Sequence, residues 1–236
     1  MGDLYQRPEN GVCIFEKLMA KFGANLRQSV KVSTEQLRGA ELKARACAEV
    51  GTILSKTPGL TSTQQEITCI FGEIFADLIC SLYFAACALD RPAQMVLRRV
   101  LDLGAATVYL WDLPHAFWGW KKHDEDLNFN QMLEHFGSEG YKTYLCAINP
   151  KLCVSQLLDH AGARKVYRDL SNAIHGKLTT FESLLPDRFI HTAQDWQGHL
   201  ELVHKVEDIL LNLWKNRFGE VERSLVVTMP QLQKIP

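Results

Sequence analysis

The most constraining feature of the sequence is a long apolar segment followed by a very short turn. Residues 67–89 are almost entirely apolar, and Asp90-Arg91-Pro92 follows them directly. Ser62-Thr63-Gln64-Gln65 has the pattern of a capping box, which predicts a helix from Ser62 to about Leu89. Proline near the start predicts a second helix that ends at about Leu113. So short a link predicts an antiparallel helix hairpin.

The position of the turn sets which residues of the hairpin should meet. A fold at residue 90 or 91 places Arg98 near Tyr83 and Asp77 near Gly104. Gly104 has no side chain, so we expect the two backbones to approach closely around Asp77.

Four charged residues of the hairpin are expected to be buried polar groups: Glu73, Asp77, Arg98 and Asp102. Acids inside an apolar helix usually pair with a buried cation or line a subunit interface. Arg98 and Arg99 are the candidate cations, although the expected register leaves them more than a turn away from the acids.

Residues 67–89 are also long enough to span a bilayer, which leaves a small membrane protein as an alternative. Glu73 and Asp77 lie one turn apart in the middle of this segment, however. Each charge would be costly in a membrane, so a buried core helix is the favoured interpretation and no membrane association is expected.

Helix signals recur along the rest of the chain, and strand signals are weak, with residues 224–229 as the main exception. Further helices are expected at 33–55, 130–136 and 140–147, at a segment ending near Gly176, and at 192–217. Residues 115–126 are expected to be less regular. The fold class predicted is therefore all-α, a helical bundle built around the long antiparallel hairpin.

The same pattern gives a domain division. We expect residues 1–32 to form an N-terminal arm, residues 33–219 to form the helical domain, and residues 220–236 to form an extended or frayed tail. The N-terminus is polar and lacks the apolar core of a secretory signal, so a cytoplasmic location is expected.

Charge and cysteine content narrow the function classes. The net charge is −1, so a broadly basic nucleic-acid coat is excluded and any polyanion would need a local basic patch. The chain has seven cysteines and no CxxC pair. Buried, reduced thiols are the expected state, without a disulfide framework or a zinc site.

Several families of motif are absent. The sequence has no phosphate-binding GxxxxGK[ST] loop, no GxGxxG after a strand, no HExxH and no GxSxG. Histidines and carboxylates do not occur at metal-ligand spacing. No metal and no cofactor are therefore expected.

The segment from Arg168 to His175 carries the arrangement of side chains that most specifically indicates a function. Arg168 and His175 are seven residues apart, almost two helical turns, so their side chains share one helix face about 10 Å apart along the axis. Asn172 lies between them on that face. Gly176 is expected to end the helix, which places His175 beside free carbonyls at the negative end of the helix dipole and favours the protonated imidazole.

This pair fits RNA cleavage without a metal. A histidine near neutrality suits proton transfer at a ribose 2′-hydroxyl, and an arginine fork matches phosphate oxygens. Arg164, Lys165 and Lys177 add a local basic surround for RNA. One helix supplies one base and one cation, whereas two copies across a two-fold axis would supply two of each, so a homodimer is expected.

The same residues resemble a known family. Arg168-Asp169-x5-His175 resembles the R-x4-6-H motif of HEPN domains, and Tyr167-Arg168-x-Leu170-Ser171-x3-His175-Gly176 is similar to the Y-x-x-L-S-x-x-x-H-G helix of HEPN-like bacterial proteins. Their earlier L-R-x-x-x-E/D helix is matched by residues 97–102. The resemblance covers roughly residues 62–215, mostly as a pattern of helices.

The resemblance implies a dimeric helical bundle that often acts as a metal-independent ribonuclease, as a toxin or as an antiviral-defence effector. Arg168 and His175 would then be catalytic, and Asp169 and Asn172 would orient them. RNA would be the substrate, and an antitoxin or a defence subunit a protein partner. The alternative function is a non-catalytic helical interaction or regulatory subunit of a defence complex.

Structural roles compete with each of these assignments. His175 could cap the helix C-terminus, and Arg168 could be solvated or paired with an acid such as Asp102. For Tyr167 and Ser171, roles at the edge of the core and in helix packing are favoured. The aromatic and basic run at 117–123 could stack bases, but an aromatic loop anchor is favoured.

Overall fold

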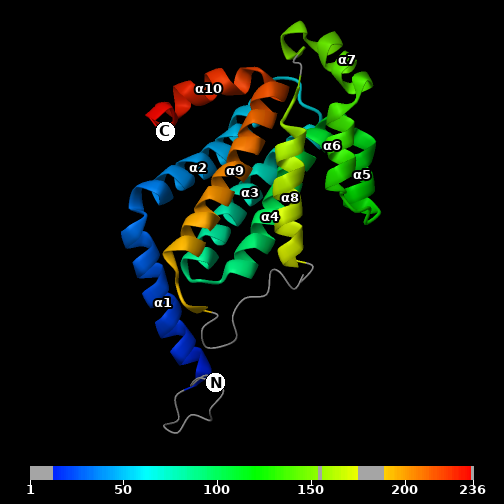
Figure 1. Cartoon of the computed structure of the whole chain (residues 1–236). Coiled ribbons are helices and arrows are strands. Elements are labelled where there is room, and N and C mark those ends of the chain that lie inside the picture. Colours follow the sequence, from blue (N-terminus) through cyan, green and yellow to red (C-terminus); the bar gives the residue numbers. More distant parts are fainter. Residues whose placement is uncertain (1–12, 154–155, 175–188, 235–236) are drawn as a thin grey trace.

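The computed structural model describes residues 13–153, 156–174 and 189–234, and this part of the chain is helical with no strand (Figure 1). This confirms the predicted all-α class. The elements are α1 (Ile14–Val32), α2 (Thr34–Ser55), α3 (Ser62–Ala86), α4 (Asp90–Asp112), α5 (Pro114–Lys122), α6 (Phe129–Gly137), α7 (Glu139–Ile148), η1 (Pro150–Leu152), α8 (His160–Ile174), α9 (Ala193–Phe218), α10 (Glu220–Thr228) and η4 (Pro230–Lys234).

The helices form a bundle of two layers. One layer contains α2, α3 and α4, and the other contains α9 and α8. Helix α3 packs between α2 and α4, and α9 packs against all three (Figure 1). Helix α8 lies on α4 and α9, and α5 to α7 gather beside α4 and α8. The outer face of α3 consequently points away from α9 and α8.

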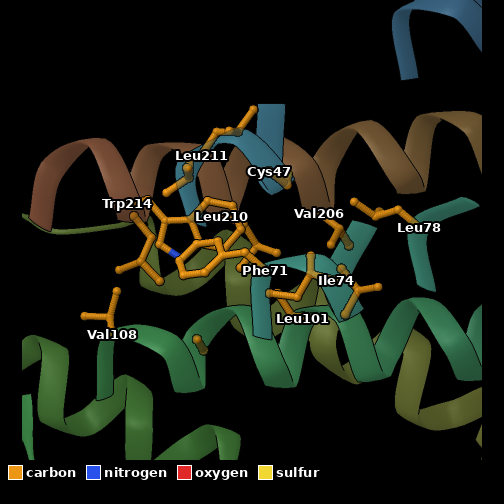
Figure 2. Close-up of a cluster of buried hydrophobic side chains, with 14 of the residues drawn as sticks. Cys47, Phe71, Ile74, Leu78, Leu101, Val108, Val206, Leu210, Leu211 and Trp214 are labelled. Carbon is orange, nitrogen blue, oxygen red and sulfur yellow. The ribbon is translucent and has the colours of Figure 1, made fainter. Parts of the chain in front are cut away.

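The core forms where α9 meets the α3–α4 hairpin. Trp214 of α9 is fully buried, and its ring lies 4.9 Å from that of Phe71, centroid to centroid (Figure 2). The indole Nε1 donates to Thr107 Oγ1 at 2.9 Å and to the Gly104 carbonyl at 3.3 Å. The large ring therefore fills the core while its one polar atom is satisfied by α4.

The predicted hairpin is confirmed, with small shifts at its ends. Thr61, not Ser62, is the N-cap of α3, and its side chain and that of Gln64 complete a capping box. Helix α3 ends at Ala86, three residues before the expected end, and Ala88 in the turn has a positive φ of 61°.

The predicted register of the hairpin is wrong. Ser81 Oγ donates to the Ala93 carbonyl at 2.9 Å, and Arg99 forms an ion pair with Asp77. The turn is centred near Ala88 and not at residue 90 or 91. Each residue of α3 therefore faces a residue of α4 that lies more than one helical turn earlier than expected. Arg98 does not meet Tyr83, and Gly104 does not face Asp77.

Gly104 instead admits a side chain from α9. A Cβ atom at Gly104 would overlap the Leu210 side chain, which is fully buried. The glycine thus allows α9, rather than α3, to approach α4 closely.

Two regions are more regular than predicted. Residues 114–122 form α5, which starts with proline in its first turn, instead of an irregular stretch. The expected extended tail forms α10 and η4, because Val221 and Leu225 are buried against the body of the protein. Helix α1 is continuous to Val32, and its buried Asn25 and Ser29 bond the carbonyls of Cys87 and Ala86.

The cysteine prediction needs two corrections. Cys146 and Cys153 form a disulfide that joins the end of α7 to the residue after η1. Of the free cysteines, Cys47 and Cys87 are buried, which raises the pKa of both thiols, whereas Cys13, Cys69 and Cys80 are exposed.

Within the described residues, α3 is the one helix long and apolar enough to cross a membrane. Its most apolar window has a mean hydropathy of 1.7, and 39% of that window is buried. Packing against α2, α4 and α9 accounts for the buried part.

Gly51 is a close-contact position that tests the α2–α3 packing. A Cβ atom there would lie 2.6 Å from Phe71 Cβ and 2.9 Å from the Thr68 carbonyl, neither of which a rotamer change can move. We expect Gly51→Ala to lower the free energy of unfolding by about 1–3 kcal/mol despite the higher helix propensity of alanine. Gly198→Ala, where nothing lies within 4 Å, should be neutral or raise it by up to about 1 kcal/mol. Urea unfolding of both variants measures the difference, and equal stabilities would contradict the packing.

Glu207 makes stability depend on pH. Its side chain is fully buried, Oε2 lies 3.2 Å from His204 Nδ1, and Oε1 has no hydrogen-bond partner in the described structure. Burial raises the pKa of Glu207 to about 7, against an ordinary value of 4.5. The folded state therefore holds this proton more tightly, and the stability it contributes is lost as pH rises through about 7.

We expect Glu207→Gln to flatten the dependence of unfolding free energy on pH between 5 and 8, by a difference on the order of 2 kcal/mol across that range. The exposed Glu201→Gln serves as the control and should keep the wild-type slope. Urea midpoints measured at several pH values give the comparison. Parallel curves for wild type and Glu207→Gln would show that Glu207 ionises normally.

Candidate functional site on helix α8

Helix α8 is anchored through one face and exposes the other. Asp159 Oδ1 accepts hydrogen bonds from the backbone N–H groups of Ala161 and Gly162 and so starts the helix. Four side chains at helical spacing are buried on the inner face: Ala163, Val166, Leu170 and Ala173. This face packs against α4 and α9.

Tyr167 is held between two flat groups. Its ring stacks on Phe129 of α6, with centroids 4.4 Å apart and planes only 7° from parallel. On the ring of Tyr167 also lies the Arg98 guanidinium, 3.6 Å from the centroid. Ser171 Oγ donates to the Tyr167 carbonyl at 2.7 Å. Tyr167 is thus held by α6 and α4, which sets the rotation of α8, whereas the hydrogen bond of Ser171 stays within α8.

Asp102 is engaged by Arg98 rather than by Arg168. Arg98 Nη2 lies 3.3 Å from Asp102 Oδ2, one turn along α4. Burial raises the pKa of Asp102 to about 6, although Arg98 acts in the opposite direction. Arg98 and Asp102 are both half-buried rather than buried as expected, and Asp102 is engaged within α4 and so not available to neutralise Arg168.

The outer face of α8 carries the exposed basic residues. Arg164, Lys165, Arg168 and Asp169 are exposed, and Asn172 is half-buried one turn after Arg168. A carboxylate partner is present for each of three other arginines, Arg98, Arg99 and Arg217. No carboxylate lies within ion-pair distance of Arg168 among the residues that the structure describes. The Arg168 guanidinium is therefore free to bind an external anion.

A shallow groove of about 330 Å³ separates the outer face of α8 from α9. Lys165 and Asp169 line it from α8, and Lys205 and Asp208 line it from α9. These charges alternate in sign, so the groove does not attract polyanions as a whole. The basic part of the α8 surface is consequently the strip of Arg164 and Arg168.

Two of the predicted site residues, and the glycine expected to end the helix, lie outside the described residues. His175, Gly176 and Lys177 directly follow Ile174, where the described part of α8 ends. The expected two-turn relation between Arg168 and His175 therefore remains a prediction.

The acids of α3 are brought together by one arginine. Arg99 pairs with Asp77 and lies 3.7 Å from Glu73 Oε2. Burial raises the pKa of Asp77, with Arg99 opposing the shift. The expectation that Glu73 is buried is wrong, because its side chain is 67% exposed on the outer face of α3.

The aromatic and basic run at 117–123 is occupied by internal contacts. Phe117 is buried, and Lys121 pairs with Glu66 of α3. The Lys121 ammonium also lies 5.5 Å from the Phe117 ring centroid and 5.4 Å from that of Trp118. Of this run, Trp118 is the large aromatic side chain with substantial exposure, at 43%.

A buried polar cluster was missed by sequence reasoning. Arg217 at the end of α9 donates to both oxygens of Asp112 at the end of α4, and Tyr141 donates to Asp112 at 2.5 Å. Burial and Asp112 raise the pKa of Tyr141. Asp112 directly follows an apolar run, which is a signal that could have indicated a buried acid, but nothing in the sequence identifies its partners. A cavity of about 560 Å³ lies beside Arg217.

Within the described residues, no group of three histidine, cysteine, aspartate or glutamate side chains could hold a metal ion. Comparison of the chain with protein-family models, with curated proteins and with solved structures gave no match, so no family membership is established.

Proposed function

We propose that this protein is a metal-independent endoribonuclease of the HEPN type, acting as a toxin or antiviral-defence effector in the cytoplasm. The observation that carries the proposal is the exposed Arg168 guanidinium on α8, without a carboxylate partner among the described residues. It lies on the helix that leads into His175, the proposed base. RNA is the substrate and no cofactor takes part.

The proposed reaction transfers one proton at each end of the phosphodiester. His175 accepts the proton of a ribose 2′-hydroxyl, and the 2′-oxygen forms a bond to phosphorus. The bond from phosphorus to the 5′-oxygen breaks, and that oxygen takes up a proton. The products are a 2′,3′-cyclic phosphate and a 5′-hydroxyl. Arg168 neutralises the negative charge that develops on the phosphoryl oxygens.

The surroundings of Arg168 support this assignment. Arg164 is exposed one turn before it, which provides a second cation for the phosphate on the 5′ or 3′ side. Asn172, one turn after Arg168, is proposed to orient the guanidinium or the substrate, and Asp169 is proposed to assist from the neighbouring position. Lys165 and Lys177 are proposed as further RNA contacts.

The proposed active form is a homodimer. One α8 supplies one arginine and one histidine, whereas a second copy facing it would add a second proton donor and acceptor. The inner face of α8 is buried against α4 and α9. The exposed outer face is therefore the part available to a second copy and to RNA.

A non-catalytic interaction module is the second candidate function, and a separate observation favours it. Helix α1 exposes large apolar side chains near its start, with Phe15 74% and Met19 73% exposed. Exposed apolar side chains that cluster on one helix mark a surface for a protein partner, such as an antitoxin or another defence subunit.

RNA cleavage in EDTA tests the nuclease proposal. His175→Ala should reduce the cleavage rate by at least about 100-fold, since general base catalysis contributes roughly that much or more. Arg168→Ala should cause a loss of similar order through the missing charge at the phosphate. Labelled RNA resolved on a denaturing gel gives the rates, and chemical analysis of the ends detects the 2′,3′-cyclic phosphate.

Arg38→Ala is the matched control, because Arg38 is also exposed but lies on α2. Its cleavage rate should equal that of the wild type. The circular dichroism spectra of wild type, Arg168→Ala and Arg38→Ala should coincide, because both arginines are exposed. The spectrum of His175→Ala separates a loss of the fold from a loss of the proposed base. Equal cleavage by His175→Ala and wild type in EDTA would end the nuclease proposal and leave the interaction module.

A further inference from the structure

The outer face of α3 is apolar and uncovered. Although α3 is the most apolar helix described, more than half of its most apolar window remains unburied. Six exposed residues form one stripe along the helix, with spacings of four, three, four, four and three residues: Gln65, Cys69, Gly72, Ala76, Cys80 and Tyr83. Such spacing keeps the side chains on one face and is typical of helix–helix contacts.

The stripe is nearly symmetric about residue 74. Reversing the helix direction about that point matches Gln65 with Tyr83, Cys69 with Cys80 to within one residue, and Gly72 with Ala76. The centre is small, and a Cβ atom at Gly72 would find nothing within 4 Å. A second α3 running in the opposite direction can therefore approach closely at the centre.

The charges beside the stripe are complementary under the same operation. Glu73 is 67% exposed and lies at the weaker distance of 3.7 Å from Arg99, whose guanidinium is mainly engaged by Asp77. A two-fold axis at residue 74, perpendicular to α3, brings the Arg99 edge of one copy against the same edge of the other. Each Glu73 then faces Arg99 of the second copy, which provides two intermolecular ion pairs.

The same charges argue against a lipid surface as the occupant. Glu73, Asp77 and Arg99 lie beside the midpoint of the stripe, and a membrane in contact with this face would have to bury them in hydrocarbon. A protein surface with opposite charges at the same level pairs them instead.

We propose that the outer face of α3 is a dimerisation surface on which a second copy of this chain packs its own α3 in antiparallel orientation. The pair places Cys69 of each copy next to Cys80 of the other. The surface is separate from the outer face of α8, on which the proposed nuclease dimer would form. The two contacts use different helices, so this proposal does not rest on the nuclease function.

Thiol crosslinking tests the pairing and its direction. Cys69 and Cys80 are separated by about 16 Å along one helix. A bis-maleimide with a shorter spacer adds one thiolate to each of its double bonds and so joins only neighbouring thiols. In a Cys13→Ser background, Cys69 and Cys80 are the exposed free cysteines, because Cys47 and Cys87 are buried. The background protein should form crosslinked dimers.

The single variants Cys69→Ser and Cys80→Ser, each made in that background, should crosslink at least tenfold less when alone. A mixture of the two should recover about half of the dimer, because Cys80 of one variant then meets Cys69 of the other. Crosslinking by either variant alone would show a parallel or different pairing and overturn the proposal.

A cysteine-independent arm uses sedimentation. Ala76→Arg puts like charges at the centre of the pair and should raise the dissociation constant at least tenfold, whereas Gly140→Arg on exposed α7 should leave it unchanged. A monomeric wild type at all concentrations would refute the surface. Flotation of monomeric protein with phosphatidylcholine–phosphatidylglycerol vesicles would assign the face to lipid and refute it as well.

Discussion

The contact of Trp214 with the α3–α4 hairpin is the interaction on which the arrangement of this protein depends. The indole lies against Phe71 of α3 and hydrogen-bonds Thr107 and Gly104 of α4, so one side chain joins three helices (Figure 2). Leu210, one turn earlier, fits over Gly104, where any larger residue would collide with it. These two contacts set the depth at which α9 enters the groove of the hairpin, and α8 then packs on the surface that α4 and α9 form together.

The positions of the helices could be predicted from the sequence, because their signals are local. Capping residues, proline and the apolar period identified α2, α3, α4 and α9 to within a few residues. The register of the hairpin could not be predicted, since the turn uses Cys87 to Leu89 and a positive φ at Ala88, a residue without any turn signal. Helix α10 was missed for a related reason. Its short sequence, rich in β-branched residues, is a weak helix former, and burial of Val221 and Leu225 stabilises it.

The candidate site was also predictable only in part. Features that depend on local helix geometry could be predicted, and contacts between distant helices could not. Helical geometry alone predicted that Arg168 and Asn172 share a face of α8. The partners of the buried charges could not be derived from sequence, because they depend on distant helices. Arg217 bonds Asp112, which lies more than one hundred positions earlier in the sequence. Glu207 is buried between α9 and α2, although it is absent from the apolar face that the sequence of α9 predicts. The disulfide likewise depends on η1 folding Cys153 back toward the end of α7.

The clamp around Tyr167 has a consequence for how α8 can be used. Stacking on Phe129 and contact with Arg98 prevent the helix from turning about its axis, because any rotation would separate the flat groups. Its solvent-facing side chains therefore keep fixed directions while their identity is unconstrained by packing. Helix α8 is therefore a rigid position at which new functional side chains could be introduced. Histidines introduced at positions 164 and 168, one turn apart, would present two imidazoles to a single transition-metal ion without disturbing the core.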